Sequence, residues 1–213
     1  MKTLAVLACW PKSRGVLGVD IAASSVRVIE LSRRRGGVVC RHHGVALLPA
    51  GLLSQDADSA TLAAALAQAC AASGSRAWRA VLAMPAEILI TQTLRLPAGL
   101  PEEQLEILVE LEAAQYIPFA LDDASLDFCP LGPAPPLPGA GAAGEVEVLL
   151  VAARRASVQQ LLEVAAAAGL QVVAIDSAAL ARQAAIEQGG WRTMADGDAV
   201  QVAWGLALHG VTP

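Results

Sequence analysis

Apolar residues along this chain follow two periods, and the switches between them predict strands and helices. Short apolar runs and alternation between apolar and polar residues are typical of strands, whereas apolar residues three or four apart are typical of helices. Strands are expected at residues 16–21, 26–31, 38–46, 80–84, 88–96, 125–131, 145–153 and 172–175. Helices are expected at residues 59–73, 101–116, 157–168, 177–188 and 198–208. Ser157 is expected to cap the third of these helices, and the last helix is expected to be amphipathic.

The order of these elements divides the chain. The first three strands are joined by short turns and predict an antiparallel meander. A strand, a helix and a hairpin at residues 86–152 form an inserted α+β subdomain, whose Pro- and Gly-rich loop at 132–144 is expected to be flexible. We therefore expect an α/β protein with a leader at residues 1–15 and a core subdomain at 16–85 and 153–213.

Composition narrows the classes of function. Only 16% of the residues are charged, where about 25% is usual, and a surface so poor in charge often has one face covered by a partner. Alanine and leucine carry the hydrophobic excess, which favours helices packed closely through small side chains. The formal net charge of −5 argues against nucleic-acid binding, and no apolar run approaches the roughly 20 residues of a membrane-spanning helix. The four cysteines show no Cys-x-x-Cys spacing, so free thiols are expected.

The turn between the first two strands carries the first candidate chemistry. Small and hydroxyl residues follow Asp20, and a tight turn of this kind leaves backbone N–H groups free to meet phosphate oxygens. The Asp20 carboxylate could hold a magnesium-bound water, with Ser24, Ser25 and Arg27 beside it. The same residues also fit a polar β-turn in which the aspartate is structural, and the sequence leaves both interpretations open.

Two stretches resemble the PilM family of type IV pilus assembly proteins. The first, Gly18–Leu31 (GVDIAASSVRVIEL), is similar to the first phosphate turn of actin-like ATPases and to the family's Gly-x-Asp-Ile pattern, which continues into Val-Lys/Arg-x-x-Glu-Leu. The second, Glu112–Phe119 (EAAQYIPF), is similar to a Glu-Ala-x-x-Tyr-Ile-Pro-Phe stretch of the family and is the more specific of the two. Weaker similarity extends over most of residues 16–185 and the last helix.

The resemblance implies an actin-like (ribonuclease H-like) first lobe, in which a mixed sheet carries flanking helices and residues 86–152 form a small neighbouring subdomain. It also implies a non-catalytic cytoplasmic adaptor of pilus or DNA-uptake assembly, peripheral to the inner membrane. Such an adaptor binds the N-terminal tail of the membrane protein PilN in a groove between those two parts; motor-side partners and a homo-oligomer are compatible with this role. The implied partner-binding residues are Glu112, Tyr116, Ile117, Pro118 and Phe119. A helix end that simply packs on a sheet is the alternative for them.

The chain departs from actin-like ATPases where their second lobe would be. Only about fifteen residues, from Gln183 to Gly197, separate the first-lobe helix from the closing helix, and an independent domain needs roughly 50. Phosphoryl transfer requires groups that position phosphates and magnesium from several sides, so we expect no ATPase activity and no ATP or magnesium cofactor. A nucleotide-binding actin-like ATPase is the alternative. The cytoplasmic actin-like component of a type II secretion system ranks lower, because the sequence ends at Pro213 without a membrane span.

Two further groups carry weaker signals. His42 and His43 are neighbours on a strand and point to opposite faces, so we expect both to be solvated and predict no metal site. The arginines at residues 33–35, together with Arg41, form a basic cluster in an acidic chain. This cluster fits a solvated turn, which we favour, or contact with anionic lipid headgroups.

Overall fold

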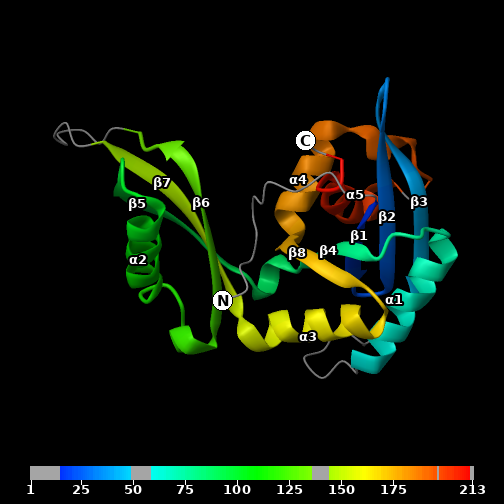
Figure 1. Ribbon diagram of the computed structural model, residues 1–213, viewed down its shortest axis with the longest axis horizontal. Helices are drawn as coiled ribbons and strands as arrows, with labels where there is room; N and C mark the ends of the chain where they lie inside the picture. The colour runs from blue at the N-terminus through cyan, green and yellow to red at the C-terminus, as the bar shows by residue number, and fades with distance from the viewer. Residues whose placement is uncertain (1–14, 49–58, 136–143, 196, 212–213) are drawn as a thin grey trace. The chain divides into compact units, whose positions relative to one another are not determined.

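The computed structural model describes residues 15–48, 59–135, 144–195 and 197–211, which form two compact units (Figure 1). The inserted unit comprises Glu87–Val158, and the sheet unit comprises the described residues of Ala8–Ala86 and Gln159–Pro213. The second boundary falls within α3 (Arg155–Ala167), whereas the sequence analysis placed it after residue 152. Nearly all of the predicted leader, and most of the predicted flexible loop, lie outside the described residues.

A mixed five-stranded sheet in the order β3-β2-β1-β4-β8 forms the sheet unit. Its strands are β1 (Val16–Ala22), β2 (Ser25–Arg34), β3 (Gly37–Leu47), β4 (Arg79–Met84) and β8 (Gln171–Ser177). The first three pair antiparallel, which confirms the predicted meander, and β4 pairs parallel with both β1 and β8. The helices that pack on this sheet are α1 (Ser59–Ser73), α4 (Ala178–Gln188) and α5 (Gln201–Leu208).

The pairing register shows which helix covers which face of the sheet. Val28 lies opposite Val19 in β1 and Gly44 in β3, so these three residues share one face, which α1 covers. The neighbouring pair, Ile29 and Gly18, shares the other face, where α5 packs on β1, β2 and β4 (Figure 1). Because both faces are covered, β1 and most of β2 are buried.

Glycine lets each helix approach the sheet closely. A Cβ atom at Gly44 would lie 2.1 Å from the backbone oxygen of Ala69 in α1. On the other face, a Cβ atom at Gly18 would lie 2.0 Å from the backbone oxygen of Ala203 in α5. Real side chains never come this near, so only glycine fits at both positions. The expectation of close packing through small residues is confirmed.

Helix α5 is buried all round, and the prediction of an amphipathic last helix is wrong. Residues 201–207 are all buried, because one side of the helix lies on the sheet and α4 packs on another. The two helices touch at Gly205, where a Cβ atom would lie 1.8 Å from the backbone oxygen of Ala181. The indole N–H of Trp204 donates a 2.9 Å hydrogen bond to the side-chain oxygen of Gln188. The helix also begins at Gln201 rather than residue 198, after the 3-10 turn Gly197–Val200.

The inserted unit is a three-stranded antiparallel sheet with one helix on it. The strands are β5 (Ile90–Pro97), β6 (Ala124–Pro133) and β7 (Glu145–Arg154), in the order β5-β7-β6, and the helix is α2 (Glu102–Ala113). Apolar residues from all four elements form one core, which includes Leu96, Val109 and Leu150. Short 3-10 turns at Ala86–Ile88 and Leu121–Asp123 lead into β5 and β6.

Two predicted helix boundaries in this region are wrong. Helix α2 ends at Ala113 rather than residue 116, because the N–H groups of Gln115 and Tyr116 donate to carbonyls only three residues back, those of Glu112 and Ala113, and so form a tighter turn. Helix α3 begins at Arg155, directly after β7, so Ser157 lies inside the helix and does not cap it. The guanidinium group of Arg155 instead donates a 3.2 Å hydrogen bond to the carbonyl oxygen of Ala124 at the start of β6.

Candidate functional site

The turn between β1 and β2 places its predicted phosphate-binding residues in different surroundings. Asp20 and Arg27 lie directly opposite each other on the two strands. Ser24 is exposed at the turn, and its carbonyl oxygen accepts a 2.8 Å hydrogen bond from the N–H of Leu48. Ser25 is buried, and its hydroxyl oxygen has no hydrogen-bond partner among the described residues. Of the four predicted residues, only Ser24 thus lies fully at the surface.

The carboxyl group of Asp20 is buried at the Gly18 face of the sheet. Burial raises the pKa of Asp20 above its ordinary value of 3.8, and the nearby guanidinium groups of Arg27 and Arg182 partly offset this shift. Arg182 lies on α4, which the sequence analysis did not connect with the turn. Asp20 is therefore a desolvated acid between two cations, a pattern common to functional sites and to structural ion networks.

The second candidate stretch, at residues 112–119, lies between α2 and the turn before β6. Ile117 is buried in the core of the inserted unit, whereas Tyr116 is 40% exposed and Pro118 is exposed. Phe119 packs against the core, and the guanidinium carbon of Arg154 lies 4.3 Å from the centroid of its ring. Glu112 accepts a short hydrogen bond from the side-chain amide of Gln115. The stretch thus combines residues that pack inside with a Tyr-Pro surface.

A second apolar surface on α2 went unnoticed in the sequence analysis. Ile107 and Leu111 lie one helical turn apart and are 65% and 68% exposed. Exposed glutamates at 103 and 110 lie three or four positions from Ile107 on the same side of the helix. The sequence could have shown this surface, because α2 has more apolar residues than one buried stripe needs. Its side toward the core is already filled by Leu105, Val109 and Ala113.

The two adjacent histidines behave differently from each other. His43 is exposed, as expected, but the prediction of a solvated His42 is wrong. The Nδ1 atom of His42 lies 3.1 Å from the carbonyl oxygen of Ser73, because β3 turns this side chain toward the end of α1. No group of three or more His, Cys, Asp or Glu residues suited to a metal ion occurs within the part of the chain that the structure describes.

Comparison with known proteins decides the family. The sequence model described as "Type IV pilus assembly protein PilM" matches residues 18–208, nearly the whole chain. This chain belongs to the PilM family. The solved structure of a PilM–PilN type IV pilus biogenesis complex is similar to it, with 29% sequence identity and a TM-score of 0.71. That similarity covers 83% of this chain and 51% of the other, so this PilM-family chain spans about half the length of the PilM chain it matches.

The structural match establishes the actin-like fold of PilM for this chain and confirms the predicted mixed α/β class. A second solved structure is the cytoplasmic domain of EpsL, an inner-membrane component of the type II secretion system of Vibrio cholerae. It is 18% identical, has a TM-score of 0.49, and covers 79% of this chain and 59% of the other. Among the described residues of the PilM-family chain, no helix has both the length and the apolar character needed to cross a bilayer.

Proposed function

We propose that this PilM-family chain is a non-catalytic adaptor of type IV pilus assembly that binds the N-terminal tail of a PilN-like inner-membrane protein. Two observations support the proposal: the family match over residues 18–208, and the similarity to a solved complex that contains both PilM and PilN. Binding such a tail would keep the protein at the cytoplasmic face of the inner membrane.

The exposed Tyr116–Pro118 surface is the feature that best supports a docking role. Tyr116 is 40% exposed although the chain has few aromatic residues. Ile117, which lies between Tyr116 and Pro118, is buried in the core of the inserted unit. Phe119 is fixed in turn by its contact with Arg154. An exposed tyrosine on a rigid backbone binds a peptide with little loss of side-chain entropy, and tyrosine is enriched at such contacts. We infer that the tail contacts Tyr116 and Pro118.

A peptide titration tests this proposal and separates it from the competing surface on α2. The probe is a labelled peptide that copies the N-terminal tail of the PilN-like protein from the same organism, and binding is read by fluorescence anisotropy. Tyr116→Ser is expected to weaken binding at least tenfold, the loss of about 1.4 kcal/mol that is usual for a contact residue of moderate importance. The matched control is Leu111→Ser, which also replaces an exposed apolar residue and should leave the affinity unchanged.

The titration has two outcomes that contradict the proposal in different ways. If the wild-type chain shows no binding at high micromolar peptide, the adaptor role itself fails. If Leu111→Ser weakens binding and Tyr116→Ser does not, the adaptor role stands but the tail binds the apolar surface of α2 instead. Melting temperatures of both variants are measured first, since a loss of binding is informative only when the inserted unit stays folded.

We also propose that the turn at Ala23 and Ser24 no longer supports ATP hydrolysis. The buried Asp20 and the buried Ser25 hydroxyl have little access to a phosphate or a hydrated magnesium ion, which supports this view. Phosphate release from ATP and magnesium by the purified chain is expected to equal that of buffer alone. Turnover above the buffer rate that Asp20→Ala abolishes would favour the alternative, a nucleotide-binding actin-like ATPase.

A further inference from the structure

A cavity of about 580 Å³ lies in the sheet unit beside Gly15, at the end of β1 opposite to the Ala23–Ser24 turn. None of the residues that surround it belongs to either candidate site described above. The described residues of the lining come from the position before β1, from β2 and β3, and from the connection between α1 and β4: Gly15, Glu30, Arg41, His42, Gly74, Arg76, Ala77 and Trp78.

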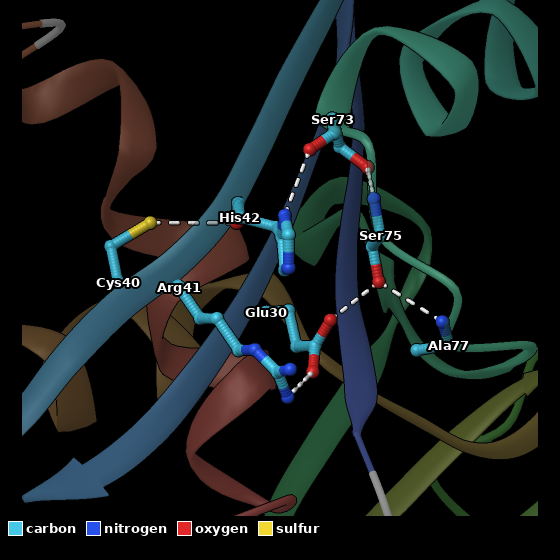
Figure 2. Close-up of polar contacts among 7 residues, drawn as sticks. All are labelled: Glu30, Cys40, Arg41, His42, Ser73, Ser75 and Ala77. Atoms are coloured by element: carbon cyan, nitrogen blue, oxygen red, sulfur yellow. Dashed lines mark hydrogen bonds and ion pairs between the residues drawn. The ribbon is translucent and has the colours of Figure 1, made fainter.

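Among the described residues of this lining, Glu30 is the only acidic one. Its charge is already satisfied by two partners (Figure 2). Its side chain comes from β2 and the residue is only 4% exposed. One carboxylate oxygen lies 3.3 Å from Nη1 of Arg41, and the other accepts a 2.5 Å hydrogen bond from the Ser75 hydroxyl group. The carboxylate thus forms an ion pair with one nitrogen of Arg41, while the Arg41 side chain remains 59% exposed to solvent.

Two more arginines lie at the same end of the sheet unit. Arg76 lines the cavity and is exposed. Arg34 lies on β2 four positions after Glu30, so strand alternation places it on the same face of the sheet. Neither Arg34 nor Arg76 forms an ion pair with a described residue. The local charge is therefore positive, although the formal net charge of the whole chain is −5.

Exposed apolar side chains accompany these cations. Trp78 lines the same cavity and is 58% exposed, and Val39, which lies opposite Ser32 on the Glu30 face, is also exposed. Exposure of the apolar indole ring to water is unfavourable. Tryptophan is stable at the level of lipid headgroups, where its ring contacts apolar groups while its N–H contacts water or polar groups. Guanidinium groups bind the phosphates of the same headgroups. The two side-chain types therefore suit one common environment.

We propose that this surface, formed by Arg34, Arg41, Arg76, Val39 and Trp78 and called the arginine–tryptophan surface below, docks directly on an anionic phospholipid membrane. Lipid phosphates lie between Arg41 and Arg76 at the mouth of the cavity, and the Trp78 indole lies among the headgroups. Charge complementarity carries the choice of occupant, because three exposed arginines lie at this end of the sheet unit while the one acidic side chain among the described cavity residues, Glu30, is already paired. The proposal is independent of tail binding, because it uses only residues of the sheet unit.

Co-sedimentation of the full chain with vesicles tests the proposal without any partner present. Vesicles with one-third phosphatidylglycerol in phosphatidylcholine are compared with pure phosphatidylcholine in 50 mM and in 300 mM NaCl. Binding is expected only to the anionic vesicles and should weaken at the higher salt concentration. Each of Arg34→Gln and Arg76→Gln should lower the partition coefficient about fivefold, and the double variant about 25-fold. Trp78→Ala should lower it further by an amount that does not depend on salt.

The matched control is Arg182→Gln, which removes an exposed guanidinium group from α4 and should leave partitioning unchanged. Equal binding to both vesicle types, or an unchanged partition coefficient in the double arginine variant, would overturn the proposal. So would a chain that ignores vesicles but binds polyglutamate through the same arginines, since the surface would then serve an acidic protein partner. Unaltered binding of the PilN-tail peptide to the double variant is expected and keeps this test separate from that of the adaptor role.

Discussion

The hydroxyl group of Ser75 donates a 2.5 Å hydrogen bond to the carboxylate of Glu30, which joins the turn after α1 to strand β2. The same hydroxyl oxygen accepts a 3.0 Å hydrogen bond from the N–H of Ala77, so it also fixes the turn itself. Arg41 contacts the other carboxylate oxygen from the solvent side. Glu30 is thus stabilised by one half-buried hydroxyl donor and one largely exposed cation, whose contributions to stability should differ.

Replacing the two partners of Glu30 separately measures that difference. Ser75→Ala is expected to lower the free energy of unfolding by about 2 kcal/mol, because a buried carboxylate loses a charge-assisted hydrogen bond. Arg41→Gln should cost less than about 1 kcal/mol, because the exposed guanidinium group is hydrated and screened by salt. Urea denaturation followed by circular dichroism provides both values. A larger loss for Arg41→Gln than for Ser75→Ala would show that the ion pair, not the hydroxyl group, fixes Glu30.

The contact between α4 and α5 predicts a severe effect from a single methyl group. Gly205→Ala would place a Cβ atom 1.8 Å from the backbone oxygen of Ala181, and backbone cannot move aside as a flexible side chain can. We expect a loss of more than about 3 kcal/mol, or failure to fold, since overpacking of this kind separates the helices. Gly36→Ala is the control, because no atom lies within 4 Å of its added Cβ. Its melting temperature should stay within a degree or two of the wild-type value.

Stability should depend on pH through Asp20. Because burial raises the pKa of Asp20 above 3.8, the folded state disfavours the charged carboxylate relative to the unfolded state. Its contribution to stability is most favourable below pH 3.8 and is lost as the pH rises through the folded-state pKa. Asp20→Asn should therefore raise the free energy of unfolding at pH 7, and this gain should shrink toward pH 3. Asp122→Asn, which changes an exposed residue, should show little gain at pH 7. A destabilised Asp20→Asn at pH 7 would mean that Arg27 and Arg182 outweigh burial.

The thiol of Cys70 should resist alkylation in the folded protein. Burial raises its pKa to about 11, so only about one molecule in a thousand carries the reactive thiolate at pH 8. Iodoacetamide at this pH should modify Cys70 far more slowly in buffer than in 6 M guanidinium chloride, where the ordinary thiol pKa returns. Mass spectrometry of the peptide that contains Cys70 measures both rates. Equal rates would show that the last turn of α1 opens readily.

Local periodicity was sufficient to predict the strands of this fold. The alternation through Val26 and Val28 gave β2, and the short turn after Ile21 joined it to β1 in the observed antiparallel register. The start of α4 was predicted to within one residue; Ser177 caps the helix, since its side-chain oxygen accepts a hydrogen bond from the N–H of Ala179, two residues along the chain. Each of these features depends on neighbours in sequence, which a single sequence displays.

The features that the sequence did not reveal depend on distant residues. The amphipathic interpretation of α5 failed because its second covering layer, α4, is visible only in three dimensions. Glu30 was recognised as part of a family pattern, but its bond to Ser75 spans 45 positions and has no sequence signature. Within residues 112–119, the sequence could not separate the buried Ile117 from the exposed Tyr116, because the direction of each side chain is set by the turn that ends α2.

The burial of α5 on every side also has a consequence for synthesis. The ribosome releases β1 and β2 long before residues 201–208, so the apolar face that includes Ile29 and Leu31 stays uncovered while most of the chain is made. The inserted unit, in contrast, is continuous from Glu87 to Val158, so all of its strands are made within one stretch of the chain. Pairing within this stretch begins before the last segments of the sheet unit have been made. We therefore expect the inserted unit to reach its native structure first. Chaperones are expected to protect the apolar face of the other sheet until α5 covers it.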